Sequence, residues 1–105
     1  MNDNYALTEA VFYILLSLCT PQHGYGIMQQ TEQMSNGRVR LAAGTLYGAL
    51  SNLCSKGWIK MLPSDAESRR KEYQITALGK EKLETELKRL KELVANGENI
   101  LKEHI

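Results

Sequence analysis

The sequence predicts a mainly α-helical fold with one small β-hairpin, of the α+β class. Three observations carry this prediction. Apolar residues recur at helical spacing in three segments of the first half of the chain. Strand-like alternation then flanks a turn-rich segment, and the C-terminal third repeats apolar residues in a heptad-like pattern. At 105 residues and 11.8 kDa, the chain has room for one compact domain and its extensions.

The first predicted helix runs from about Thr8 to Cys19, with Thr8 as its N-cap. It is apolar on nearly every side, so it must be covered on more than one side, either by the rest of the domain or by a second chain. The apolar run 10–19 is only about half of the roughly 20 residues that a membrane span requires. We therefore expect neither a membrane anchor nor an export signal.

The second predicted helix covers about 25–35 and ends at the stop signal Asn36-Gly37. The third covers about 44–56, with Gly57 as its C-cap. Leucines form the inward stripe of the third helix, whereas its opposite face carries small polar residues, one tyrosine, one lysine and no carboxylate. The outward residues are Thr45, Tyr47, Gly48, Ser51, Asn52, Ser55 and Lys56.

Two short strands are predicted at 58–62 and 69–75, joined by the turn formers of 63–68. Each strand alternates in polarity, so each should bury one face. The residues expected on the buried faces are Ile59, Met61, Tyr73 and Ile75.

A long amphipathic helix is predicted from Ala77 onward, after the N-cap Thr76. Asn96-Gly97 should kink this helix or end it early, because glycine weakens a helix interior. Its apolar residues form a heptad-like seam flanked by Lys and Glu, comprising Leu83, Leu87, Leu90, Val94 and Leu101.

The net charge of +1 is weak support for a nucleic-acid partner, but the charge is unevenly distributed. Residues 1–35 carry −3, residues 36–71 carry seven basic and two acidic groups, giving +5, and residues 72–105 carry −1. The two cysteines, Cys19 and Cys54, fall in apolar helical stretches. We expect both to be buried free thiols, which favours a reducing cytoplasm.

The sequence gives no support for an enzyme. It contains no motif that groups Ser, His and an acid, no phosphate-binding glycine loop and no carboxylate pair flanked by apolar residues. Cys19, His23 and Cys54 suggest a metal sensor, but they lack a closely spaced pair of ligands, which favours core or loop roles. We expect no metal and no cofactor, and we expect His23 to make local hydrogen bonds.

Helix, helix, helix, hairpin, helix is the element order of a winged helix-turn-helix with a C-terminal extension. In that fold the third helix enters the major groove of DNA, and the hairpin lies beside it near the backbone. The sequence therefore predicts a winged-helix DNA-binding domain at 1–76. It also predicts a C-terminal dimerisation helix at 77–105, because a monomer would expose both the apolar seam and the apolar first helix.

Several blocks of the chain resemble the PadR family of transcriptional regulators, over about residues 7–93. The resemblance implies winged-helix dimers that are commonly repressors released by a small molecule. The single C-terminal helix is similar to the family's short branch, in which that helix packs on the partner's first helix. The matching blocks are HGYGI at 23–27, GTLYGALSNL at 44–53, KGWI at 56–59 and RRKEYQITALG at 69–79.

The resemblance puts Thr45 and Tyr47 against DNA at the start of the recognition helix, and it puts three cations at the start of the second wing strand. Strand alternation sends the middle cation, Arg70, to the face opposite the other two. The predicted DNA-binding residues are Thr45, Tyr47, Ser51, Asn52, Lys56, Arg69, Arg70 and Lys71.

Two of these roles have open alternatives at the level of sequence. Tyr47 is either a phosphate contact or a surface aromatic that packs its ring on its own helix. Ser51 and Asn52 either reach base edges or are simply solvated. The cationic run at 69–71 would in isolation be a solvated surface rather than a binding site.

The expected partners are a second copy of the chain and a pseudo-palindromic DNA operator, read by two recognition helices about 34 Å apart. A small-molecule effector would lie between the first helix and the partner's last helix. Drug-sensing relatives of the short branch carry an aromatic at about Leu90, whereas the leucine here offers no ring for stacking. The alternative function is a winged-helix dimer that binds proteins and not DNA. The predicted effector residues are Phe12, Leu83, Leu87 and Leu90.

Overall fold

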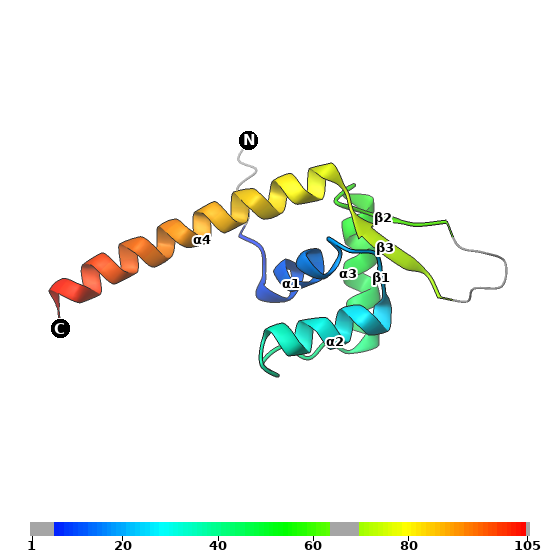
Figure 1. Ribbon diagram of the computed structural model, residues 1–105, viewed down its shortest axis with the longest axis horizontal. Coiled ribbons are helices and arrows are strands. Elements are labelled where there is room, and N and C mark those ends of the chain that lie inside the picture. Colours follow the sequence, from blue (N-terminus) through cyan, green and yellow to red (C-terminus); the bar gives the residue numbers. More distant parts are fainter. Residues whose placement is uncertain (1–5, 64–69, 105) are drawn as a thin grey trace.

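The computed structural model describes residues 6–63 and 70–104 of the chain. It confirms the predicted mainly α-helical α+β fold of the winged-helix type, with four helices and a small antiparallel sheet (Figure 1). The elements are α1 Glu9–Ser17, β1 Gln22–His23, α2 Gly24–Met34, α3 Ala43–Ser55, β2 Ile59–Met61, β3 Glu72–Ile75 and α4 Ala77–Glu103.

The predicted helix signals lie where the helices begin and end. Thr8 Oγ1 accepts a hydrogen bond from Val11 N at 3.1 Å at the start of α1. Thr76 Oγ1 accepts one from Gly79 N at 3.1 Å at the start of α4. Gly57 follows α3 with a φ of 77°, the left-handed conformation that glycine adopts most easily after a helix.

The sheet has the order β1-β3-β2, so β3 is the central strand. β2 pairs antiparallel with β3 in a register that sets Ile59 opposite Ile75. β1 was not predicted, because two residues are too short to show alternation. Its pairing with β3 sets His23 opposite Glu72, which brings the start of α2 beside the base of the wing.

The hydrophobic core surrounds one side of α1. Ile14 and Leu15 are almost completely buried, whereas Phe12 and Leu16 on the same helix are only half-buried. One chain therefore covers one side of α1 fully and leaves the other partly open. The buried hydrophobic residues are Ile14, Leu15, Leu18, Ile27, Leu46, Leu50, Leu53, Ile59, Tyr73, Ile75 and Leu83.

The C-terminal half of α4 projects away from the domain (Figure 1). Every residue from 91 to 104 is exposed. The radius of gyration of 16.0 Å accordingly exceeds the value of about 13 Å that a compact chain of this length has. The prediction of a kink or early end at Asn96-Gly97 is wrong, since α4 continues to Glu103. One glycine costs a helix only about 1 kcal/mol, and the flanking residues are good helix formers.

Three further expectations are corrected by the structure. Cys19 is exposed and not buried, because α1 ends at Ser17 and Cys19 falls in the following turn. Met61 opposes the buried Tyr73 but is itself 48% exposed. The second wing strand begins at Glu72 and not at residue 69.

The start of α4 packs closely against the wing at Gly79. A Cβ atom at this position would collide with the carbonyl oxygen of Trp58. Thr76 N donates a hydrogen bond to the same oxygen at 2.9 Å, and Thr76 Oγ1 donates one to Gly57 O at 2.7 Å. The junction between β3 and α4 is therefore tightly held to the start of the wing.

Candidate DNA-binding surface

The outward face of α3 is exposed, small and free of carboxylates. Gly48 lies at its centre, and at about 100° per residue Thr45 and Tyr47 flank it on opposite sides. Apart from the neighbouring residues and backbone of α3 itself, no described atom lies within 4 Å of the positions that a Cβ atom would take at Gly44 or Gly48. This face can therefore approach another surface closely. The predicted residues exposed on α3 and its C-cap are Thr45, Tyr47, Ser51, Asn52 and Lys56.

Tyr47 leans from α3 toward the first residue of α2. Its hydroxyl lies so close to Gly24 that a Cβ atom there would collide with it. The ring thus packs against a neighbouring helix and stays 51% exposed. It borders a cavity of about 270 Å³ lined by His23, Gly24, Tyr25, Tyr47, Arg70 and Lys71.

This cavity brings Tyr47 together with two of the three predicted wing cations. Arg70 and Lys71 both line it, although strand alternation was expected to send them to opposite faces. They precede β3, so the alternation rule does not apply to them. The third predicted wing cation, Arg69, lies outside the described residues.

The predicted DNA-binding residues did not include three others that line the cavity, Gly24 and the side chains of His23 and Tyr25. His23 Nδ1 accepts a hydrogen bond from Gly26 N at 3.1 Å, the local bond expected of this histidine, and its Nε2 lies 3.2 Å from Arg70 Nη1. Tyr25 is 61% exposed, and its hydroxyl oxygen accepts a hydrogen bond from Gln29 Nε2 at 3.3 Å. The signal that could have found all three is their position at the start of a helix.

Lys56 stands apart from this cavity. Its Nζ lies 4.8 Å from the centre of the Trp58 ring, a distance at which a cation and an aromatic face attract each other. The ammonium group of this predicted DNA-binding residue is thus held at the end of α3 that lies near β2.

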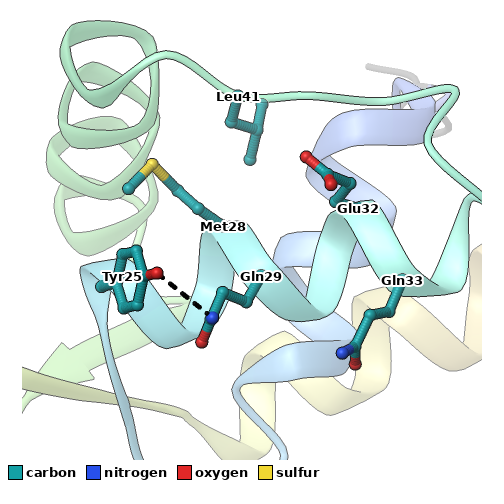
Figure 2. Close-up of a pocket in the computed structure, with 6 residues that line it drawn as sticks. All are labelled: Tyr25, Met28, Gln29, Glu32, Gln33 and Leu41. Carbon is teal, nitrogen blue, oxygen red and sulfur yellow. Dashed lines mark hydrogen bonds between the residues drawn. The ribbon is translucent and has the colours of Figure 1, made fainter.

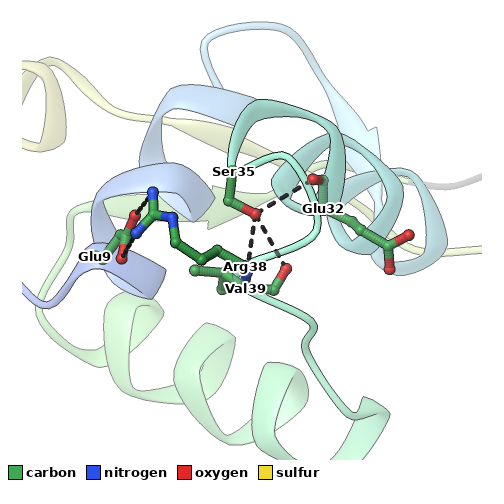
Figure 3. A network of polar contacts seen from close by, with 5 residues as sticks. All are labelled: Glu9, Glu32, Ser35, Arg38 and Val39. Atoms are coloured by element: carbon green, nitrogen blue, oxygen red, sulfur yellow. Dashed lines mark hydrogen bonds and ion pairs between the residues drawn. The ribbon is translucent and has the colours of Figure 1, made fainter.

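Other cations of the basic segment are matched by acids from residues 1–35. Arg38 forms an ion pair with Glu9 (Figure 3), which raises the pKa of Arg38 through a hydrogen bond. Arg40 Nε lies 3.7 Å from Glu32 Oε1. Ser35 Oγ accepts a hydrogen bond from the backbone nitrogen of Val39 at 2.9 Å, which fixes the loop between α2 and α3. The positive charge of the segment is therefore concentrated toward the wing.

A second cavity of about 310 Å³ lies on the outer side of α2 (Figure 2). Leu41, from the loop that leads to α3, faces Met28 across it, and Glu32 closes one end. The sequence did not predict this cavity, because Leu41 reaches it from outside any helix.

The four predicted effector residues divide into two pairs in a single chain. Leu87 and Leu90 line a shallow cavity of about 330 Å³ on α4 together with Val94. Leu83 is buried in the core, and Phe12 packs against the core from α1. One chain alone therefore does not bring the four to a common cavity.

Within residues 6–63 and 70–104, no three His, Cys, Asp or Glu side chains are arranged to hold a metal ion. Burial raises the pKa of the Cys54 thiol and of the Tyr73 hydroxyl, so both stay uncharged at neutral pH. In the same part of the chain, no helix is both long and apolar enough to cross a bilayer.

Comparison with known families agrees with this geometry. The model of the PadR-like family of transcriptional regulators matches residues 12–85, well over half of the chain. The chain belongs to the PadR-like family. This membership confirms the resemblance seen in the sequence blocks.

Solved structures of transcriptional regulators share the fold. A PadR family regulator from Clostridium difficile R20291 is 27% identical, with a TM-score of 0.65, and the match covers 87% of this chain and 96% of that one. A regulator from Clostridium thermocellum is 19% identical, with a TM-score of 0.69 and 91% of both chains covered. Both of these proteins, which this PadR-like chain resembles, are described as transcriptional regulators.

Among curated proteins, the chain is 37% identical over 79 residues to an uncharacterized 37.1 kDa protein of a Streptomyces fradiae transposon. The match covers 74% of this chain and 22% of the relative. The chain therefore spans about a fifth of the length of that relative.

Proposed function

We propose that this chain is a sequence-specific DNA-binding regulator that acts in the cytoplasm as a homodimer and represses transcription until a small molecule releases it. The observation that carries the proposal is the cavity where Tyr47 meets Arg70 and Lys71, beside the carboxylate-free face of α3. A phenolic hydroxyl and two cations around a concave site suit a DNA phosphate. The adjoining small-residue helix face suits the major groove.

The two parts of this surface have different roles: the cavity positions the protein on the DNA backbone, and the exposed face of α3 reads the bases. Tyr47, Arg70 and Lys71 hold phosphates, and each ionic contact releases counterions from DNA. Ser51 and Asn52 contact base edges from the exposed face of α3, where loss of one contact costs about 1 to 3 kcal/mol at a particular operator position. Thr45, Lys56 and Arg69 extend the contacts to the DNA backbone.

The homodimer is supported by apolar surface that a single chain leaves open. Leu87, Val94 and Leu101 of the predicted seam are 44%, 58% and 65% exposed. So much exposed apolar surface on one helix is a liability for a monomer. In this proposal residues 1–76 bind DNA, residues 77–105 dimerise, and the partner's helix covers the half-buried side of α1.

The effector site lies at the seam between α1 and the partner's α4, lined by Phe12, Leu87 and Leu90. The fourth predicted residue, Leu83, is buried in the core of its own chain and does not face this seam. A ligand there changes DNA binding only if it prefers one spacing of the two recognition helices. One protein of similar fold, BpsR of Bordetella bronchiseptica, is described as regulated in its DNA binding by 6-hydroxynicotinic acid; it is 16% identical to this chain, with a TM-score of 0.69.

The test compares two duplexes, one from the promoter of the protein's own gene and one of the same composition in shuffled order. Wild-type protein should bind both in a salt-sensitive manner and prefer the promoter. Tyr47→Phe keeps the ring that packs against α2 and removes only the hydroxyl, so it should melt as the wild type does but bind both duplexes more weakly. Lys71→Ala should also lower the salt slope by about one unit per lost ionic contact.

Lys88→Ala is the matched control, because Lys88 is an exposed cation on α4, away from the proposed surface. It should leave affinity and salt slope unchanged. Wild-type protein that shows no salt-sensitive binding to either duplex would contradict the proposal. That result would favour the alternative of a winged-helix dimer that binds proteins.

A further inference from the structure

The two ring nitrogens of His23 face two hydrogen-bond donors. Nδ1 lies 3.1 Å from the backbone nitrogen of Gly26, and Nε2 lies 3.2 Å from Arg70 Nη1. A neutral imidazole has one nitrogen that accepts and one that carries a proton. An arginine guanidinium has donors only. The ring therefore cannot accept hydrogen bonds from both neighbours at once.

The bond to Gly26 is the one that the fold favours. It is half-buried and caps the first turn of α2, whose backbone donors would otherwise lack partners. The contact with Arg70 is exposed, so water can replace it at little cost. The neutral ring therefore carries its proton on Nε2.

With that proton in place, Nε2–H and the guanidinium of Arg70 are two donors that face each other at the rim of the Tyr47 cavity. Two donors at this distance repel each other, and an anionic oxygen that accepts from both removes the repulsion. Lys71 and the Tyr47 hydroxyl line the same cavity, and its described lining residues include no carboxylate.

We propose that His23 binds a DNA backbone phosphate through Nε2–H, sharing it with Arg70, while its Nδ1 caps α2. This inference rests on the proposed function, because the phosphate is that of the DNA. The contact of His23 with the phosphate is made by a neutral group. Unlike the lysine and arginine contacts, it should therefore add nothing to the salt dependence of DNA binding.

The decisive variant is His23→Asn. The asparagine oxygen can take the position of Nδ1 and keep the cap, since Asn is among the best N-cap residues, but nothing replaces Nε2–H. The variant should melt as the wild type does and bind the promoter duplex and the shuffled duplex about tenfold more weakly. Its salt slope should equal that of the wild type, whereas Arg70→Ala should lower the slope by about one unit per half-site.

A second measurement needs no substitution at His23. The chain has two histidines, so the variant His104→Gln leaves one imidazole to observe by ¹⁵N NMR. The free protein should show a neutral ring protonated on Nε2, and the Nε2–H signal should shift when the promoter duplex is added. A proton on Nδ1 would overturn the proposal, as would a signal that does not respond to DNA.

The outcomes separate this inference from the proposed function. If the wild type binds DNA and His23→Asn binds equally well, the phosphate contact of His23 is refuted and the regulator stands. If the wild type shows no salt-sensitive DNA binding, the proposed function fails and this contact fails with it.

Discussion

Glu86 is a buried carboxylate that ties α4 to the segment preceding α1. It is only 4% exposed, and it accepts hydrogen bonds from Arg89 Nε and Nη2, both at 2.7 Å, and from Leu7 N at 2.9 Å. Glu86→Gln keeps the size of the side chain, but its NH₂ group would face one of the hydrogen-bond donors that the carboxylate now accepts from. We expect this change to lower the free energy of unfolding.

The magnitude follows from the three bonds. A hydrogen bond to a charged group contributes about 1.5 to 3 kcal/mol, but the Arg89 side chain is 35% exposed and regains part of its bonds from water. The amide oxygen of the glutamine can also still accept one of these hydrogen bonds. The net loss should be about 2 to 3 kcal/mol, which lowers the melting temperature by roughly 10 °C in a domain of this size.

The loss should depend on pH. Hydrogen bonds from Arg89 hold the pKa of Glu86 below its ordinary value of 4.5, burial opposes this, and the Leu7 N–H and the charge of Arg89 add to the lowering. Because the folded protein then binds this proton less readily than the unfolded chain, the stabilisation is complete above about pH 4.5. It is lost as the pH falls through the lowered pKa.

Thermal melts of wild type and Glu86→Gln, at one protein concentration, measure the difference at pH 7 and again near pH 3. The gap should be wider at pH 7 than near pH 3. Glu84→Gln is the control, since Glu84 is exposed on the same helix and its removal should change little. A gap of the same width at both pH values would refute the role assigned to the Glu86 carboxylate.

Two other changes test the proposed interface and the core. Leu87→Asp should convert the dimer into monomer or insoluble protein, because it puts a charge into the apolar seam; an unchanged dimer by light scattering would remove this interface. Thr31 is fully buried, and its hydroxyl has no hydrogen-bond partner within the described residues. Thr31→Val should therefore raise the free energy of unfolding by about 1 kcal/mol in urea denaturation, and Thr31→Ser should not; lowered stability of Thr31→Val would contradict this.

The order of the elements could be predicted from the sequence because the signals are local. Thr8 and Thr76 each lie within three residues of the amide that they cap, and Gly57 ends α3 through its own backbone angle. The same local reasoning overestimated Asn96-Gly97, where a weak local preference for breaking the helix did not prevail. A weak local preference of this kind ends a helix only when the neighbouring residues also disfavour the helix.

The candidate site could be predicted only in part, because its residues meet through contacts distant in sequence. Tyr47 approaches Arg70 because the two-residue β1 pairs with β3, and two residues carry no periodic signal. Arg38 finds its partner Glu9 29 residues away, so the count of cations in the middle segment overstated the charge available for DNA. The chemistry of His23 depends on which donor faces each ring nitrogen, which only the folded backbone decides.

In the proposed dimer, the two attachments of α4 to its own domain would determine how a change at the seam reaches the DNA. Near its start, Gly79 and Thr76 hold the helix against the Trp58 carbonyl, and two turns later Glu86 holds it to Leu7. Both attachments lie within residues 76–86, so the exposed remainder of α4 is continuous with a rigidly held segment. A change in the angle between two partnered α4 helices would therefore rotate each winged domain as a whole. Since α3 belongs to that domain, the spacing of the two α3 helices in the proposed dimer would follow the packing of α4, and an effector at the proposed seam would need no separate hinge.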